Sequence, residues 1–134
     1  MFATIADVVA IVTTPEPPAV THAYGLIRIL TSRRLPAVLS LIVNRAADQA
    51  EANRVYARVA AASHKFLNFP LEDGGYVLQD SHVELAVRGR QPFVVSFPRC
   101  PSSLCVASLA MRWARIPIRR DAGSWTARFG ALFA

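Results

Sequence analysis

The hydrophobic positions along the chain change their spacing from one segment to the next. Residues 7–13 form a continuous apolar run, which is typical of a strand buried on both faces of a parallel sheet. The letters TPEPP end this run, and Pro17 and Pro18 suit the first turn of a helix. Apolar residues then recur at helical spacing, at Val20, Ala23, Ile27 and Leu30. The pattern predicts a strand, a turn and a helix that stops before Pro36.

Two further strand and helix units follow. Residues 37–43 read as a second strand, and the helix after it presents an apolar face of Ala52, Val55, Tyr56, Val59 and Ala62. A short third strand, GGYVLQD, is expected after a glycine turn, which places Asp73 in a loop. Asp80 or Ser81 can cap the next helix, over 81–91. The inward residues of that helix are expected to be Val83, Ala86 and Val87.

The remaining segments complete an alternating order of strands and helices. PFVVSFPRCP is expected to be extended or irregular, and a last helix is expected over 102–114. This order implies right-handed crossovers between successive strands, and hence an α/β fold of three layers, with a mainly parallel sheet of three or four strands and flanking helices. We assign 1–116 to this domain and 117–134 to a C-terminal tail.

Composition narrows the class of protein. The 134 residues suit one small domain, and a hydrophobic content of 53% is sufficient for a core. No apolar run approaches the roughly 18 residues that span a bilayer, and no signal peptide is recognisable, so a cytoplasmic location is expected. The net charge of +6 comes almost entirely from dispersed arginines, which favours a solvated surface over nucleic acid binding. Cys100 and Cys105 are expected to be reduced thiols, and we predict no metal site.

Ligands of such sheets lie at the carboxyl ends of the strands. Three segments follow strands in the predicted order. The first contains Thr14, Pro15 and Glu16, the second Asn44 and Arg45, and the third Gln79 and Asp80.

Several of these stretches carry a resemblance to a known family. ADVVAIVTTPEPPAVTHAYGLIRIL, LIVNRA, RVYARVAAASHKFL, GGYVLQDSHVELAVRGRQPFVVSFPR and LCVASLAMR resemble, in that order, the second half of MinD/ParA-type ATPases. The FlhG/FleN branch, which regulates flagellar number and placement, is the most similar. In that family the strand matching 7–13 pairs with the strand that leads into the phosphate-binding loop. The resemblance therefore implies a partial P-loop NTPase fold without its P-loop half.

The phosphate-binding residues of that family cannot be found in these 134 residues. A P-loop ends in Gly-Lys-Ser/Thr after a glycine-rich turn, whereas the one lysine, Lys65, stands in SHKF with no glycine near it. The chain by itself is therefore expected not to hydrolyse ATP, and no catalytic residue is assigned. ATP and magnesium would be cofactors only if a partner chain that carries a P-loop completes the site.

The resemblance does imply residues for base recognition. In the family, the asparagine of the VN turn hydrogen-bonds adenine and the segment matching VLQD closes over the base. An amide has both a donor and an acceptor, which fits the edge of adenine; the alternative is that Asn44 only caps the following helix. The matching residues are Asn44, Arg45, Leu78, Gln79 and Asp80.

The tail has its own pattern. Trp125, Phe129, Leu132 and Phe133 fall on one stripe of a helix, and Arg128 adds positive charge. Such a helix suits peripheral contact with an anionic membrane, which members of the resembling family also make, or docking on the domain or on a partner.

Two classes of function remain open at this point. The chain is either a truncated or split nucleotide-binding regulator of cell or flagellar organisation, or a degenerate interaction module or gene fragment that acts, if at all, through its surface. The strand at 7–13 bears on both, because its edge lacks its family neighbour and is expected to bind a partner or a second copy.

Overall fold

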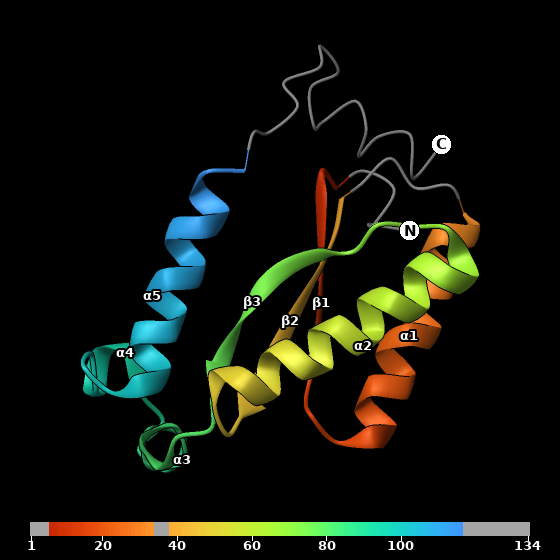
Figure 1. Cartoon of the computed structure of the whole chain (residues 1–134). Helices are drawn as coiled ribbons and strands as arrows, with labels where there is room; N and C mark the ends of the chain where they lie inside the picture. Colours follow the sequence, from red (N-terminus) through yellow and green to blue (C-terminus); the bar gives the residue numbers. More distant parts are fainter. Residues whose placement is uncertain (1–5, 34–37, 117–134) are drawn as a thin grey trace.

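The computed structural model describes residues 6–33 and 38–116, and all structural statements below concern these residues. They form a parallel sheet of three strands in the order β1-β2-β3, with β2 in the centre. Figure 1 shows α2 crossing in front of the sheet, with α1 and α5 at its two sides. The elements are β1 Val8–Thr13, α1 Pro17–Ser32, β2 Val38–Ala46, α2 Gln49–Leu67, β3 Glu72–Leu78, α3 Ser81–Arg88, α4 Phe93–Ser96 and α5 Pro101–Ala114. The predicted fold class, α/β with a parallel sheet and flanking helices, is confirmed.

The main core lies between the sheet and the first two helices. Ile11 of β1 and Leu41 of β2 pack against Ile27 of α1 and Val59 of α2, and all four side chains are at least 97% buried. The predicted inner face of α1 is confirmed, with prolines in its first turn. On α2, Ala52 and Val59 are buried as expected.

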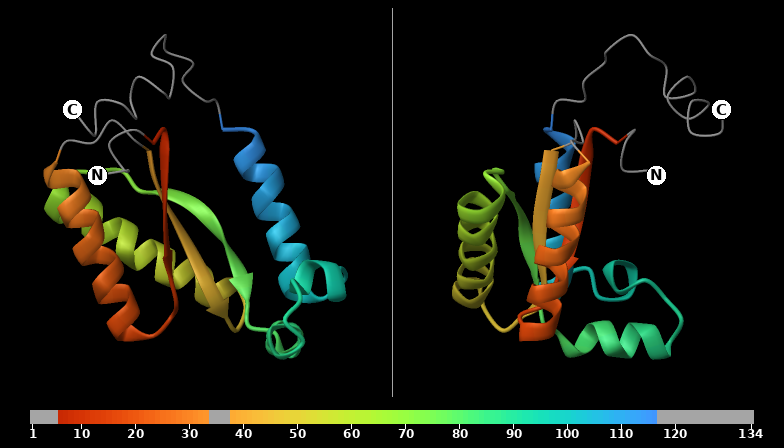
Figure 2. Two further views of the ribbon diagram at one scale, coloured as in Figure 1. Left: turned by 180° about the vertical axis from the view of Figure 1, so that it is seen from behind. Right: turned by 90° about the vertical axis from the view of Figure 1, so that its right-hand side faces the viewer.

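The opposite face of the sheet is largely open over β1 and β2. Seen from behind in Figure 2, none of the described helices lies over these two strands. Ala10 is exposed, and the side chains of Val12 and Val38 are 59% and 45% exposed. The prediction that the strand at 7–13 is buried on both faces is therefore wrong for the described residues, because they leave one face of β1 and part of β2 uncovered.

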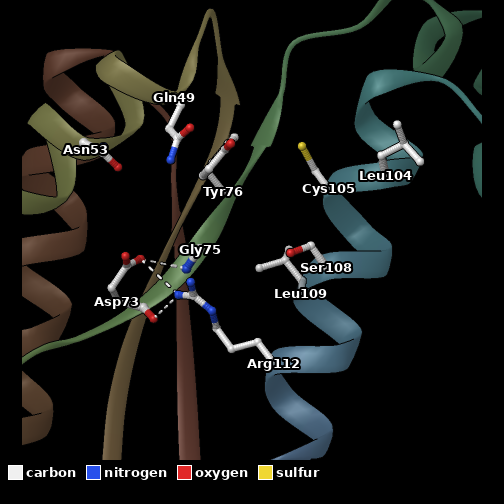
Figure 3. A pocket seen from close by; sticks show the side chains of 10 residues that line it. All are labelled: Gln49, Asn53, Asp73, Gly75, Tyr76, Leu104, Cys105, Ser108, Leu109 and Arg112. Carbon is white, nitrogen blue, oxygen red and sulfur yellow. Dashed lines mark hydrogen bonds and ion pairs between the residues drawn. The ribbon is translucent and has the colours of Figure 1, made fainter.

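Helix α5 lies along the outer edge of β3 and closes it. Its side chains donate hydrogen bonds to backbone carbonyls of the strand: Ser102 Oγ to Leu78 O at 2.8 Å, Arg112 Nη1 to Asp73 O at 2.7 Å and Trp113 Nε1 to Gly74 O at 3.5 Å. Figure 3 shows Arg112 reaching from α5 to Asp73 on β3. Among the described residues, the outer edge of β1 has no comparable cover, so the two edges of the sheet differ.

Two glycines allow the close packing around β3. A Cβ added at Gly74 would lie 2.7 Å from Ser40 Oγ, and one added at Gly75 would lie 2.5 Å from Leu109 Cδ2. Gly75 also has a φ of +98°, which other residues rarely adopt. The prediction of a glycine turn before the strand is wrong, because both glycines and Asp73 lie within β3.

Three other predicted features also require correction. Asn44 and Arg45 do not follow β2 but lie near its end, since the strand extends to Ala46. The segment around Phe93 forms the short helix α4 rather than an extended segment. Val87 points outward, 69% exposed, because α3 packs mainly on α4 and ends at Arg88.

The remaining predictions concern the cysteines, membrane spans and the C-terminal tail. Both cysteines are free thiols, as expected. Within the described part of the chain, no helix is long and apolar enough to cross a membrane. The tail stripe of Trp125, Arg128, Phe129, Leu132 and Phe133 lies outside the described residues.

Candidate functional site

A cavity of about 380 Å³ opens at the carboxyl ends of β2 and β3. Its volume lies in the range of about 300–1,000 Å³ that is usual for small-molecule sites. All five residues expected to recognise adenine line this cavity. The complete lining is Asn44, Arg45, Val77, Leu78, Gln79, Asp80, Val83, Glu84, Phe93 and Ser102.

The end of β2 is shaped by an unusual backbone. Arg45 has a φ of +59°, in the left-handed region that few residues other than glycine adopt. Its N–H donates to the side-chain Oδ1 of Asn44 at 2.9 Å, which stabilises this conformation locally. The register between β2 and β3 shifts between Val43 and Ala46, so the strand bulges at this point. Strained backbone of this kind is often found at binding sites.

This geometry orients the amide of Asn44. Because Oδ1 accepts the Arg45 N–H, the Nδ2 amino group is left as the free donor, and it makes no hydrogen bond within the described residues. Asn44 does not cap α2. Asp48 does so by accepting from Glu51 N at 2.7 Å, and Glu51 Oε2 accepts from Ala47 N, as in a capping box. The alternative that Asn44 only caps the following helix is therefore wrong.

The other wall comes from β3 and the residues after it. The ladder continues past the bulge, with Ala46 opposite Leu78 and the Gln79 N–H donating to Ala46 O at 2.8 Å. Leu78 O is held by Ser102 Oγ from α5. Leu78 is thereby fixed between the end of β2 and the start of α5, and its side chain forms part of an apolar wall with Val77, Val83 and Phe93.

Asp80 has a structural role beside the cavity. Its carboxylate accepts from the backbone N–H of His82 at 3.0 Å and of Ser102 at 3.1 Å, so it binds the first turns of both α3 and α5. Its side chain is only 5% exposed. These N–H groups, that of His82 first, hold the pKa of the Asp80 carboxyl well below its usual range. Asp80 therefore positions the cavity walls, and each oxygen of its carboxylate accepts one of these two backbone N–H bonds.

The first post-strand segment does not line the cavity. Thr14, Pro15 and Glu16 lead into α1, where Glu16 is the N-cap residue without a side-chain cap bond. A hydrogen bond with Thr14 is the main cause of the lowered pKa of Glu16, and the charge of Arg45 adds to it. Glu16 therefore lies near Arg45 at the carboxyl end of the sheet, but it does not line the cavity.

Sequence reasoning missed half of the lining. Glu84 and Val83 belong to α3, Phe93 to α4 and Ser102 to α5. Contacts between residues far apart in the chain hold these helices at the cavity, among them the bonds of Asp80 to α3 and α5 and the bond of Ser102 Oγ to Leu78 O. The sequence around Phe93 gives no sign that this residue lines a cavity, because the segment is predicted to be extended or irregular.

The cavity combines two features suited to a planar heteroaromatic ring. Aliphatic and phenyl side chains supply apolar contact, while the free amino group of Asn44 can donate to a ring nitrogen. Arg45 is exposed and forms no ion pair among the described residues, so its charge is available to an anionic substituent.

Comparison with known proteins gives three findings. No protein-family model matches the chain. The antiactivator FleN of Pseudomonas aeruginosa is 27% identical over 111 residues, which cover 83% of this chain and 40% of FleN. The MinD cell division protein of Aquifex aeolicus has a similar structure, with a TM-score of 0.62 and 22% identity, over 86% of this chain and 48% of MinD. The chain thus spans less than half the length of either protein.

The MinD likeness shows the shared fold, and the FleN similarity supports the predicted branch. Together they support the interpretation of the chain as similar to a C-terminal portion of MinD/ParA-type proteins.

Proposed function

We propose that the chain provides the base-recognition side of a nucleotide-binding regulator of the FleN kind. The observation that supports this most directly is the cavity at the ends of β2 and β3, which brings together Asn44, Arg45, Leu78, Gln79 and Asp80. FleN is named as an antiactivator, and the family resemblance implies flagellar regulation, so the proposal includes a regulatory role in cell or flagellar organisation.

The base-recognition side differs from a complete ATP site. Most of the affinity for a nucleotide in P-loop proteins comes from backbone N–H groups and a lysine around the phosphates, and the 134 residues contain no such motif. We therefore expect weak binding of the base alone. Tight binding of ATP with magnesium requires a P-loop supplied by another segment or chain, which would pair with the open edge of β1.

The test is equilibrium binding of adenosine and guanosine, measured by calorimetry or ligand-detected NMR. Adenosine should bind with an affinity in the millimolar range, about −4 kcal/mol, and guanosine should bind more weakly. Asn44→Ala removes the free donor and should abolish the preference between the two nucleosides. Asn53→Ala is the matched control, because Asn53 is an exposed asparagine of α2 outside the cavity.

An unchanged preference in Asn44→Ala, or equal binding of both nucleosides by the parent chain, would overturn the proposal. Unfolding curves of both variants check that each retains the fold.

A second function is favoured by a separate observation. The open edge of β1 and the exposed side chains of Ala10, Val12 and Val38 form a surface that we call the β1 surface. An interaction module needs no nucleotide, and this surface is where it would bind a second copy or a partner chain. Association that is insensitive to adenosine and to Asn44→Ala would favour this function over the first.

A further inference from the structure

Three potential metal ligands converge where α3 and α5 begin. Asp80 offers a carboxylate oxygen, His82 a ring nitrogen and Cys100 a thiol sulfur, and these atoms all lie within 4.8 Å of one another. His82 Nδ1 is 2.7 Å from Asp80 Oδ1. Sequence spacing does not reveal the group, because Cys100 is distant from the other two along the chain and meets them only in the fold.

The distances are close to those of a metal site. Zinc binds sulfur at about 2.3 Å and nitrogen or oxygen at about 2.0–2.2 Å, so the ligands of a tetrahedral ion are roughly 3.3–3.8 Å apart. The three atoms now lie within 4.8 Å of one another, so changes of about 1 Å or less in their separations would reach these values. The mixture of sulfur, nitrogen and oxygen donors suits zinc and similar divalent transition metals better than calcium or magnesium.

Neighbouring groups already hold the three side chains in place. Two backbone N–H groups fix the carboxylate of Asp80, which leaves lone pairs of its oxygens for an ion. The ring of His82 packs against Phe97, with centroids 4.9 Å apart. Cys100 is 93% buried, and its Sγ lies 3.3 Å from Ser103 Oγ. Such supporting contacts are typical of metal sites, where they orient the ligands.

A path from solvent reaches the group. His82 and Cys100 line a shallow hollow on the surface, whose other residues are Phe97, Pro98, Arg99 and Pro101. An ion bound by the three side chains would have its fourth position directed to this hollow, where water or an external ligand can occupy it.

We propose that Asp80, His82 and Cys100 bind a divalent transition-metal ion of the zinc class, with a fourth position open to solvent. Binding requires the thiolate of Cys100, so the thiol proton is released to solvent when the ion binds. The ion would join the first turns of α3 and α5 beside the base cavity. This site shares Asp80 with the lining of the base cavity, but the free donor and the charge proposed for base recognition belong to Asn44 and Arg45, which take no part in it.

Cobalt(II) titration of the untagged full chain, under reducing conditions, tests the proposal. A thiolate ligand produces a near-ultraviolet charge-transfer band, which should saturate at one cobalt per chain and disappear when zinc is added. Zinc should also raise the melting temperature of the parent chain, since an ion that binds only the folded state stabilises it.

Variants assign the ligands. Cys100→Ser should eliminate the charge-transfer band, and His82→Gln should weaken binding by more than the roughly 10–100-fold expected for the loss of a supporting residue. Cys105→Ser is the matched control and should keep both the band and the zinc-dependent melting shift, because Cys105 lies on α5 in a different pocket. Circular dichroism of the metal-free variants checks folding. If Cys100→Ser does not fold, the half-exposed His82 still provides the test.

The absence of the band in the parent chain would show that the three groups form only a hydrogen-bonded cluster, and would overturn the proposal. So would a band that persists in Cys100→Ser but is lost in Cys105→Ser. Nucleoside binding is measured separately, so failure of either proposal leaves the other intact.

Discussion

Replacing Val12 by lysine should weaken association through the β1 surface and leave the fold nearly unchanged. The Val38 N–H donates to Asp7 O at 3.0 Å, and β1 then runs parallel to β2 from Val8 opposite Val38. Because backbone groups alternate in direction along a parallel strand, the amides of Val8, Ala10 and Val12 point away from β2. A lysine at position 12 would place a charge beside this edge, which pairs with no other described strand, as natural edge strands often do.

The structure sets the size of the effect. Burying a valine side chain completely is worth about 1.5–3 kcal/mol, and 59% of Val12 is exposed. A partner that covers Val12 therefore gains roughly 1–2 kcal/mol from it, which corresponds to about 5- to 30-fold in the dissociation constant. The part of Val12 that is already buried in the folded chain is smaller than the exposed part, so it contributes less free energy to folding. The aliphatic stem of a lysine can replace some of that contact. We expect the free energy of unfolding to change by less than about 1 kcal/mol.

Sedimentation equilibrium over a range of concentrations measures association, and urea unfolding measures stability. Val87→Lys is the matched control, because Val87 is 69% exposed on α3, away from the β1 surface. The control should associate like the parent chain. Equal weakening by Val12→Lys and Val87→Lys would show a general effect of charge. A monomeric parent chain whose Val8, Ala10 and Val12 amides are strongly protected from exchange would refute the account of an open edge.

Three further outcomes are expected. With magnesium and ATP, the chain should show no hydrolysis above background, because it has no P-loop sequence; turnover that survives repurification and is lost in Asn44→Ala would contradict this. A chain that ends at Ile118 should cosediment less with anionic vesicles than the full chain, owing to the apolar stripe of the tail, and equal binding would exclude the tail as an anchor. In the presence of a chelator, stability should fall as pH decreases below about 4, the ordinary pKa of Asp. The pKa of Asp80 is lowered in the folded state because its carboxylate accepts hydrogen bonds from the first turns of α3 and α5. Protonation of the carboxylate weakens these bonds and so destabilises the fold. Asp80→Asn should therefore flatten the acid side of the stability profile, and identical profiles would refute this role.

The elements with strong periodicity could be predicted from the sequence alone. The apolar run of β1, the prolines of α1 and the spacing of Ala23, Ile27 and Leu30 are local signals, and the structure has each element in place. The position of a ligand site at the carboxyl ends of the strands can also be predicted, because the order of elements implies a parallel sheet. The five residues implied by the family resemblance meet in one cavity for that reason.

Features that depend on contacts between distant residues were not predictable in the same way. Gly74 and Gly75 look like a turn because glycine is common in turns, whereas here Ser40 and Leu109 require the absence of a Cβ. The predicted end of β2 at residue 43 is too early, because the bulge at Arg45 allows pairing to continue to Ala46. Likewise, nothing in the spacing of His82 and Cys100 indicates that they meet.

The most direct test of the proposed base-recognition site is to map adenosine onto the chain by NMR. Addition of adenosine should shift the side-chain amide of Asn44 and the backbone amides of Leu78 and Gln79, while guanosine at the same concentration should leave them nearly unchanged. Shifts confined to a different pocket, such as that between α2 and α5 around Asn53 and Arg112, or equal shifts with both nucleosides, would contradict the account.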